Sequence, residues 1–307
     1  MHSFHIPVLS EEVVHYLNCN KGSGVYVDCT LGGGGHSKAI LEKIYPQGLL
    51  IGIDQDIEAL RIAQEELSSF RDRVILVKDN FKNLGEILSR LKIDKVSGVL
   101  FDLGVSSYQL KKKERGFSFQ EDGPLDMRMD LSQKFDAAKL VNSYPEKELI
   151  RVLENYGEEH FSKRIARLIV LEREKRPITT TQQLADLVLR ALPPAKRGER
   201  WRIHPATRVF QAIRIEVNRE MEVLAEGLNQ AIKVLAGEGR ICVISYHSLE
   251  DRIVKNVFKE AAREIGKPPT YGLKIITKKP LKASPEEIRR NPRARSAKLR
   301  VAEKLID

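Results

Sequence analysis

The 307-residue sequence predicts an α/β fold in which a Rossmann-like, doubly wound parallel sheet is interrupted by a helical insertion. Three observations support this prediction. Apolar, β-branched runs alternate with helix-like segments between residues 25 and 102. Each of these runs ends in an acid, at the edge where ligands bind to open parallel sheets. Between about residues 105 and 201 the alternation stops, and no convincing core strand is present.

The first predicted strand, residues 25–30, leads into four consecutive glycines at 32–35 and a helix from about Ser37 to Ile44. Glycine lets a ligand approach the backbone closely, and the N-terminus of the helix points at that ligand. A tight turn without a ligand would also use glycine. Four glycines in a row after a buried strand favour a ligand-binding loop.

Three further strands follow, and helical segments join them. The strands are expected at residues 49–54, 74–79 and 96–102, with helices at about 57–68 and 84–91 and a short leading helix at 10–17. The second strand ends at Asp54 and the fourth at Asp102, whereas Asn80 and Phe81 follow the third. Strands that alternate with helices at this spacing form parallel sheets.

Helical patterns fill the insertion and lead back to the sheet. They lie near residues 137–142, 146–156, 162–175 and 181–191, before a long helix at about 206–235, a strand at 240–246 and a helix from 247. Two strand-like segments, 273–278 and 297–302, could pair as an antiparallel edge. We expect residues 1–104 and 206–307 to form one domain and residues 105–205 an inserted helical domain.

The charge balance points to an anionic partner. A net charge of +10 favours nucleic acid first and a membrane surface second, although such a charge can also serve solubility alone. Cys19, Cys29 and Cys242 show no zinc-binding spacing, and their odd number fits a reducing cytosol. No signal peptide is evident, and no apolar run approaches the roughly 18 residues of a membrane span. We expect a cytoplasmic protein without a metal site.

Two cofactors fit a glycine loop with an acid closing the second strand, namely NAD and S-adenosylmethionine. With either one, Asp54 would hold the ribose hydroxyls, unless it is only a surface carboxylate. The loop lacks the usual GxGxxG spacing, carries His36 at its end, and no constellation suggests hydride transfer. Asp102-Leu103-Gly104 occupies the place where amino-group methyltransferases have an acidic or amide residue and a tight turn. The pattern favours a methyltransferase over a dehydrogenase.

Seven longer motifs resemble a single family. They are Gly33–Ser37 (GGGHS), Asp102–Ser107 (DLGVSS), Arg115–Phe119 (RGFSF), Asp122–Asp130 (DGPLDMRMD), His204–Arg208 (HPATR), Ser245–Arg252 (SYHSLEDR) and Asn291–Ser296 (NPRARS). Together they resemble the bacterial 16S ribosomal RNA cytosine-N4-methyltransferases. The similarity runs nearly end to end, and its long motifs are highly specific.

The resemblance implies a class I methyltransferase fold, S-adenosylmethionine as the methyl donor, and a helical insertion that faces the substrate. It also implies methylation of a decoding-centre cytosine in 16S rRNA, with the small ribosomal subunit as the setting. The donor contacts of the family fall on Gly34, Gly35, His36, Asp54, Phe81, Asp102 and Gln109. The family often has a larger residue where this chain has Gly33, and we expect little effect on binding.

Several of these residues also have an ordinary structural explanation. Phe81 fits packing against adenine, with Asp79 and Asn80 offering polar groups to the adenine edge, but it could be a plain core residue. His36 is expected to be a donor contact and not a catalytic base. Gln109 rests mostly on the resemblance.

Asp102 is the predicted catalytic residue. The lone pair of cytosine N4 is delocalised into the ring, which makes the amine a poor nucleophile. A carboxylate that accepts an N–H hydrogen bond from this amine favours the pyramidal, nucleophilic nitrogen. Asp102 could instead only cap the following turn or only hold the donor. His247 could touch the target base or cap a helix, and Trp201 fits core packing better than base stacking.

Clusters of basic residues would contact the RNA. A solvated face explains most single runs, but several runs near one candidate cleft favour phosphate contacts. The clusters comprise Lys111, Lys112, Lys113 and Arg115; Lys163, Arg164 and Arg167; Lys196, Arg197, Arg200 and Arg202; and Arg289, Arg290, Arg293, Arg295, Lys298 and Arg300. The target base would have to leave its stack. A binding-only ribosome assembly factor is the non-enzymatic alternative, and the oligomeric state stays open, with a homodimer included.

Overall fold

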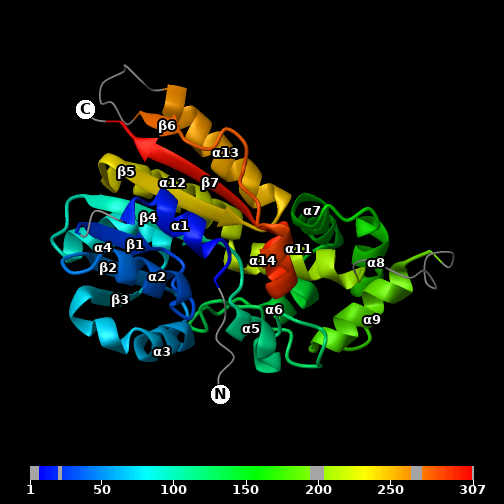
Figure 1. Cartoon of the computed structure of the whole chain (residues 1–307). Coiled ribbons are helices and arrows are strands. Elements are labelled where there is room, and N and C mark those ends of the chain that lie inside the picture. Colours follow the sequence, from blue (N-terminus) through cyan, green and yellow to red (C-terminus); the bar gives the residue numbers. More distant parts are fainter. Residues whose placement is uncertain (1–6, 20–22, 194–203, 264–271, 306–307) are drawn as a thin grey trace. The chain divides into compact units, whose positions relative to one another are not determined.

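A computed structural model of the chain describes residues 7–19, 23–193, 204–263 and 272–305 (Figure 1). The chain divides into two compact units. Residues 1–104 and 221–307 form the first, which we name the sheet unit, and residues 105–220 form the second, which we name the helical unit.

A seven-stranded sheet with the order β3-β2-β1-β4-β5-β7-β6 is the centre of the sheet unit. The strands are β1 (Val25–Asp28), β2 (Leu49–Asp54), β3 (Val74–Lys78), β4 (Val96–Asp102), β5 (Leu235–Ser245), β6 (Leu273–Ile275) and β7 (Lys298–Lys304). Strands β1 to β5 pair in parallel, whereas β7 is antiparallel to its neighbours β5 and β6. The predicted doubly wound parallel sheet is thereby confirmed, with an antiparallel edge formed by the tail.

Helices cover both faces of this sheet. They are α1 (Ser10–Tyr16), α2 (Gly35–Lys43), α3 (Ile57–Glu66), α4 (Leu84–Arg90), α12 (Glu220–Val234), α13 (Ser248–Arg263) and α14 (Pro285–Arg290), with 3-10 turns at Ser68–Arg73, Phe81–Asn83 and Pro292–Ser296. Successive strand side chains point to opposite faces. Tyr26 therefore packs in the core beside α1 and α2, whereas Val27 packs in the core beside α4 and α12. Burial on both faces explains why the strands read as nearly continuous apolar runs.

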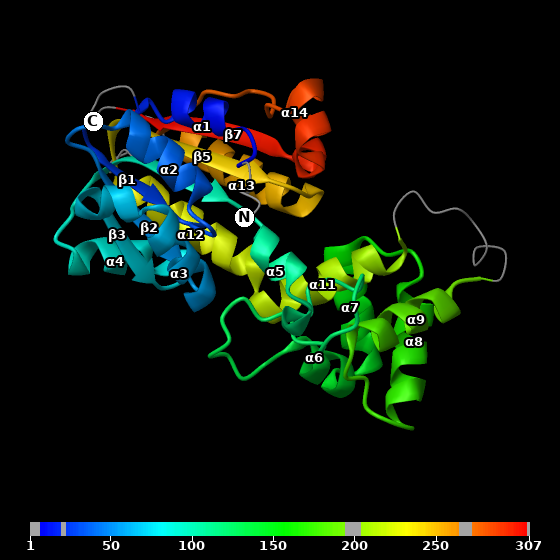
Figure 2. The ribbon, with the colours of Figure 1, turned by 60° about the horizontal axis from the view of Figure 1, so that its bottom comes forward.

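Helices also build the helical unit (Figure 2). They are α5 (Ser107–Lys111), α6 (Ala137–Ser143), α7 (Glu146–Gly157), α8 (Ser162–Arg173), α9 (Thr181–Ala191) and α11 (Ala206–Asn218), with a 3-10 turn at Lys113–Arg115. Thr180 caps α9, because its side chain accepts a hydrogen bond from the N–H of Gln183. The apolar faces of α6, α7, α8, α9 and α11 meet in one continuous core.

The long helix expected at residues 206–235 is in fact two helices. The chain leaves α11 at Arg219, whose φ of 49° is left-handed, and α12 then begins at Glu220. The buried face of α11, including Ile213, belongs to the core of the helical unit. The second boundary between the units therefore lies after residue 220, and not after residue 205 as we expected.

The three cysteines lie in the core of the sheet unit. Cys19, Cys29 and Cys242 are free thiols in buried positions, and burial raises the pKa of Cys19 to about 12. Such thiols are poor nucleophiles because the thiolate form is suppressed.

Among the described residues, no helix has both the length and the apolar character needed to cross a membrane.

Candidate active site

The glycine loop joins the carboxyl end of β1 to the start of α2. Gly32 and Gly34 have left-handed φ angles of 50° and 84°, which residues with a side chain rarely adopt. The N–H of Gly34 donates to the carbonyl of Leu31 and closes the turn. Because α2 begins at Gly35, the N–H groups of its first turn lack intrahelical partners and offer donors to a ligand.

Asp54 ties the end of β2 to this loop. One of its carboxylate oxygens accepts from the N–H of Gly32 at 2.9 Å, and the other accepts from the N–H of Asp56 at 2.8 Å. Burial raises the pKa of Asp54 to about 6, although both hydrogen bonds act in the opposite direction. The side chain is only partly buried, so its oxygens can still meet a ligand at the sheet edge.

Asp28, at the end of β1, is an acid whose role was not predicted. It is 1% exposed, and its carboxylate accepts from the hydroxyl of Ser37 at 2.7 Å and from the N–H of Thr30 at 3.1 Å. Burial raises its pKa. Asp28 therefore links the chain after β1 to the first turn of α2 and supports the glycine loop between them. In the sequence, only the position of Asp28 at the end of a strand pointed to such a role.

Asp102, at the end of β4, has hydrogen-bond partners for its N–H and for one carboxylate oxygen. Its N–H donates to the hydroxyl of Thr30 at 2.6 Å. Its Oδ1 accepts from the hydroxyl of Tyr246 at 2.8 Å, and its Oδ2 lies 3.5 Å from Nε2 of His36. No backbone N–H of the described residues donates to this carboxylate, so it is not the cap of the turn at Gly104.

His36 is buried beside Asp102, with two further acids acting on its charge. Burial by itself would lower its pKa, but the nearby carboxylate of Asp102 and the charges of Asp28 and Glu287 raise it. Both ring nitrogens are buried and neither has a hydrogen-bond partner in the described part of the chain, although Nε2 lies 3.5 Å from Oδ2 of Asp102. An orphaned polar atom of this kind fits a ligand contact, because leaving it unpaired costs free energy.

Phe81 and Asp79 follow β3 at the same edge. The ring of Phe81 meets Phe101 edge to face, with 5.3 Å between centroids, and also lies against Gly227. Asp79 was expected to offer a polar group to adenine. Instead its carboxylate accepts from Asn80, Asn83 and Arg90, and the hydrogen bonds from Asn83 and Arg90 lower its pKa although burial would raise it. Asp79 therefore holds the loop together.

Gln109 belongs to the helical unit and lies on α5. Its side-chain oxygen accepts from the N–H of Ser106, and its own N–H donates to the hydroxyl of Ser106. This reciprocal pair is a capping box, in which Gln109 occupies the third helical position. The side chain is buried, and its oxygen is already used for the cap.

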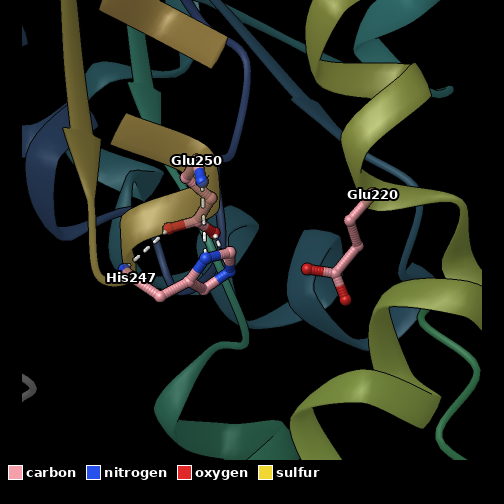
Figure 3. Close-up of side chains that lie close together, drawn as sticks. All are labelled: Glu220, His247 and Glu250. Carbon is pink, nitrogen blue, oxygen red and sulfur yellow. Dashed lines mark hydrogen bonds and ion pairs between the residues drawn. The ribbon is translucent and has the colours of Figure 1, made fainter. Parts of the chain in front are cut away.

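His247 caps α13 (Figure 3). Its Nδ1 accepts from the N–H of Glu250, and Oε2 of Glu250 accepts from the N–H groups of His247 and Tyr246. The arrangement matches a capping box with histidine in place of serine. Of the two roles considered for His247, the structure therefore supports the cap. Trp201 lies outside the described residues.

These contacts bring the glycine loop, His36, Asp54 and Asp102 together at one edge of the sheet. Three features fit S-adenosylmethionine: a glycine loop that ends at the N-terminus of α2, the unpartnered Nδ1 of His36, and a carboxylate at the end of β2. The fold adds a seven-stranded sheet with one antiparallel strand. Fold and site together define a class I S-adenosylmethionine-dependent methyltransferase.

Comparison with known proteins gives the family. The model of the MraW methylase family matches residues 2–305, and the chain belongs to this family. A ribosomal RNA small subunit methyltransferase H from Carboxydothermus hydrogenoformans is 54% identical over 98% of both chains. Proteins of the same name from Clostridium botulinum (strain Loch Maree) and Clostridioides difficile are 51% and 49% identical, over at least 98% of either chain. Membership in a methylase family decides against the dehydrogenase.

The structure shows that the basic residues expected at the RNA are not all available to it. Arg300 is 8% exposed and donates twice to Asp251, and Arg115 is 3% exposed and donates to the carbonyl oxygens of Arg128 and Met129. The expectation is therefore wrong for Arg300 and Arg115, whose charges hold the fold. Exposed cations without an ion-pair partner among the described residues are Lys111, Lys113, Lys163, Arg164, Arg167, Arg289 and Arg295. The cluster at 196–202 lies outside the described residues.

Proposed function

We propose that this protein transfers a methyl group from S-adenosylmethionine to the exocyclic N4 amine of a cytosine in the decoding centre of 16S rRNA. The similarity to relatives named ribosomal RNA small subunit methyltransferase H, over nearly the full length of both chains, supports the substrate. The observation that carries the chemistry is the carboxylate of Asp102, held at the sheet edge with one oxygen near His36 and the other on Tyr246.

In this proposal the donor lies on the glycine loop. Gly34 and Gly35, at the start of α2, would contact it through the backbone, and Nδ1 of His36 would supply a polar contact. Asp54 accepts hydrogen bonds from the ribose hydroxyls, and Phe81 packs against the adenine. Gln109 and Asp102 complete the proposed set of donor contacts. When bound, the donor supplies an electrophilic methyl group.

Asp102 prepares the amine. Its carboxylate accepts an N–H hydrogen bond from cytosine N4, which weakens the overlap of the nitrogen lone pair with the ring. Binding on the sheet edge fixes that nitrogen in line with the methyl group. As the new N–C bond forms, the bond between the methyl group and the sulfonium sulfur would break, and that sulfur would keep the electron pair as a neutral thioether. N4 becomes positively charged, and its proton leaves to Asp102 or to water. A general base of this kind typically contributes 10²- to 10⁴-fold to a rate.

The helical unit would recognise the substrate. Lys163, Arg164 and Arg167 are exposed on α8, and no described acid pairs with them. Cations on one helix face contact phosphates without reading sequence, so selection of the cytosine would depend on RNA shape and on extrusion of the base. The expected domain 105–205, extended to residue 220, would be the substrate-recognition domain.

Methyl transfer from labelled S-adenosylmethionine tests this proposal. Naked 16S rRNA, immature small subunits and mature small subunits should be compared side by side. Nucleoside analysis of the labelled RNA should yield N4-methylated cytosine from at least one of them. Binding of RNA or subunits without turnover would favour the ribosome assembly factor instead, and a product methylated at another atom would refute the assignment of N4.

Three minor parts of the proposal have simple tests. Activity should survive a chelator if no metal takes part. Light scattering decides between a monomer and a homodimer. Because the proposed substrate is ribosomal, we place the protein in the cytoplasm, where fractionation should find it with small subunits.

A further inference from the structure

We infer that Tyr246 is a positioning residue for the methyl transfer, whose hydroxyl fixes the orientation of the Asp102 carboxylate. The inference rests on the proposed function and adds a residue for which the sequence indicated no role. The hydroxyl of Tyr246 donates to Oδ1 of Asp102 at 2.8 Å. With Oδ1 engaged, Oδ2 is the oxygen left for the amine, and Nε2 of His36 stands 3.5 Å from it.

Rigid structure holds Tyr246 from its backbone side. Its N–H donates to Oε2 of Glu250 at 2.8 Å, and Glu250 is 2% exposed inside the cap of α13. Strand β5 pairs with β4 up to Ile244 and Asp102, and the N–H of Leu103 donates to the carbonyl of Ile244. The strand that presents Tyr246 is therefore in register with the strand that presents Asp102.

Tyr246 stays protonated and therefore acts only as a donor. Burial, followed by the negative charge of Asp102 and the hydrogen bond to it, raises the pKa of Tyr246 far above the ordinary value of a tyrosine. The phenol cannot compete for the proton of the amine. Arg293 and Glu250 are the other charged groups that act on it, and neither accepts its hydrogen bond.

The physical consequence concerns rotation of a carboxylate about its Cβ–Cγ bond. This torsion has a broad energy profile, so an unrestrained side chain populates many orientations. A hydrogen bond to a charged group contributes about 1.5–3 kcal/mol. Loss of that bond should lower the rate about 10- to 100-fold, because a tenfold change corresponds to about 1.4 kcal/mol.

Tyr246→Phe is the matched test, since it removes one oxygen and keeps the ring. The control is Tyr26→Phe, which removes a hydroxyl that contacts the carbonyl of Asn18 at 3.3 Å in the core of the same sheet unit. We expect kcat for methylation of small-subunit RNA to fall about 10- to 100-fold in Tyr246→Phe. KM for RNA and Kd for S-adenosylmethionine should change less than about threefold, and Tyr26→Phe should keep the wild-type kcat.

A double-mutant cycle with Asp102→Asn adds a readout that a merely structural role would not move. If Tyr246 acts through Asp102, adding Tyr246→Phe to Asp102→Asn should cost much less than it does in the wild-type background. A full additional loss would overturn the inference, as would an unchanged kcat or an effect confined to KM for RNA. In all these outcomes the wild type still methylates the RNA. Failure of the wild type to do so would refute the proposed function itself.

Discussion

His36 and Asp102 face each other at the carboxyl edge of the sheet, with Nε2 of the imidazole 3.5 Å from Oδ2 of the carboxylate. Parallel pairing of β1 with β4 produces this contact, because it sets the glycine loop beside the end of β4. An imidazole with a raised pKa beside a carboxylate favours opposite charges on the two groups. The proposed donor site and the proposed catalytic group are thus coupled electrostatically.

Asp102→Asn keeps the size of the side chain and removes its charge. We expect kcat for methyl transfer to fall at least about 100-fold, as for loss of a general base. Calorimetry should show Kd for S-adenosylmethionine changed by less than about tenfold. A suitable control is Asp79→Asn, since that acid lies at the same edge but is bound to Arg90. Full activity of Asp102→Asn would remove the catalytic assignment and leave the function standing.

Binding of S-adenosylmethionine should weaken in acid because the pKa of Asp54 is raised to about 6. If only the carboxylate holds the ribose, Kd should be roughly tenfold higher at pH 5 than at pH 7.5. In the absence of donor, acid has the opposite effect on stability. The folded chain binds the proton of Asp54 more tightly than the unfolded chain does, so the free energy of unfolding should rise as pH falls through about 6.

Calorimetry between pH 5 and 8 checks the Asp54 prediction. Asp54→Asn should bind more weakly and should lose this part of the pH dependence, while any dependence that remains belongs to groups such as His36. A donor affinity that is independent of pH in the wild type would argue against Asp54 as the ribose ligand.

Gly227→Ala tests whether Phe81 serves the donor or only the core. A Cβ at residue 227 would lie 2.5 Å from the Phe81 ring and 3.5 Å from Phe101, so Phe81 must move. We expect a loss of about 1–3 kcal/mol in stability from overpacking and a several-fold higher Kd for S-adenosylmethionine.

The control for Gly227→Ala is Gly85→Ala on α4. There the new Cβ would meet only the flexible amide of Gln230, so the gain in helix propensity should leave stability unchanged or raised by up to about 1 kcal/mol. Loss of stability in Gly227→Ala with an unchanged Kd would assign Phe81 to the core alone.

Arg295 and Arg300 lie close together in the sequence, but we expect only Arg300 to stabilise the fold. Arg300→Met should cost about 2 kcal/mol of unfolding free energy, because it leaves the carboxylate of Asp251 without its bidentate partner. Arg295 is exposed and has no ion-pair partner among the described residues, so Arg295→Met should change stability by less than about 0.5 kcal/mol. Denaturant unfolding measures both, and equal losses would contradict the distinction.

The cations of α8 should contribute to RNA affinity through phosphate contacts. For Arg164→Ala/Arg167→Ala we expect weaker RNA binding, and the slope of log K against log salt should fall by about 1 to 2. The double variant Lys255→Ala/Lys259→Ala removes the same charge from the exposed face of α13. If the two double variants have equal effects in a salt titration, the cations of α8 contribute to RNA binding only through the net charge of the protein.

Local sequence predicted much of the sheet unit. The expected bounds of β2 and β4, residues 49–54 and 96–102, are those observed, because burial on both faces leaves an uninterrupted apolar run. The break at Arg219 could not be predicted in this way. A left-handed residue other than glycine leaves no clear signal, and both flanking helices have apolar faces. The second boundary was therefore expected too early.

For the candidate site, the sequence predicted the positions of the acids but not their hydrogen-bond and ion-pair partners. The sequence placed an acid at the end of every early strand, but it could not tell which acids are already satisfied. Asp79 is bound by Arg90 and Asp28 by Ser37, whereas Asp102 meets Tyr246 and His36. The role of Tyr246 was missed because β5 follows β4 in space but only after the helical insertion in the chain.

The sequence alone determined the class of fold, the glycine loop and the family resemblance, because apolar periodicity and motifs are local properties of the chain. Only the tertiary structure decided which charges are available for function. Arg300 and Arg295 look alike in the sequence, yet β7 places Arg300 against Asp251, whereas the 3-10 turn before β7 leaves Arg295 in solvent. The same holds for Asp102, whose orientation depends on a tyrosine that strand pairing brings within 2.8 Å.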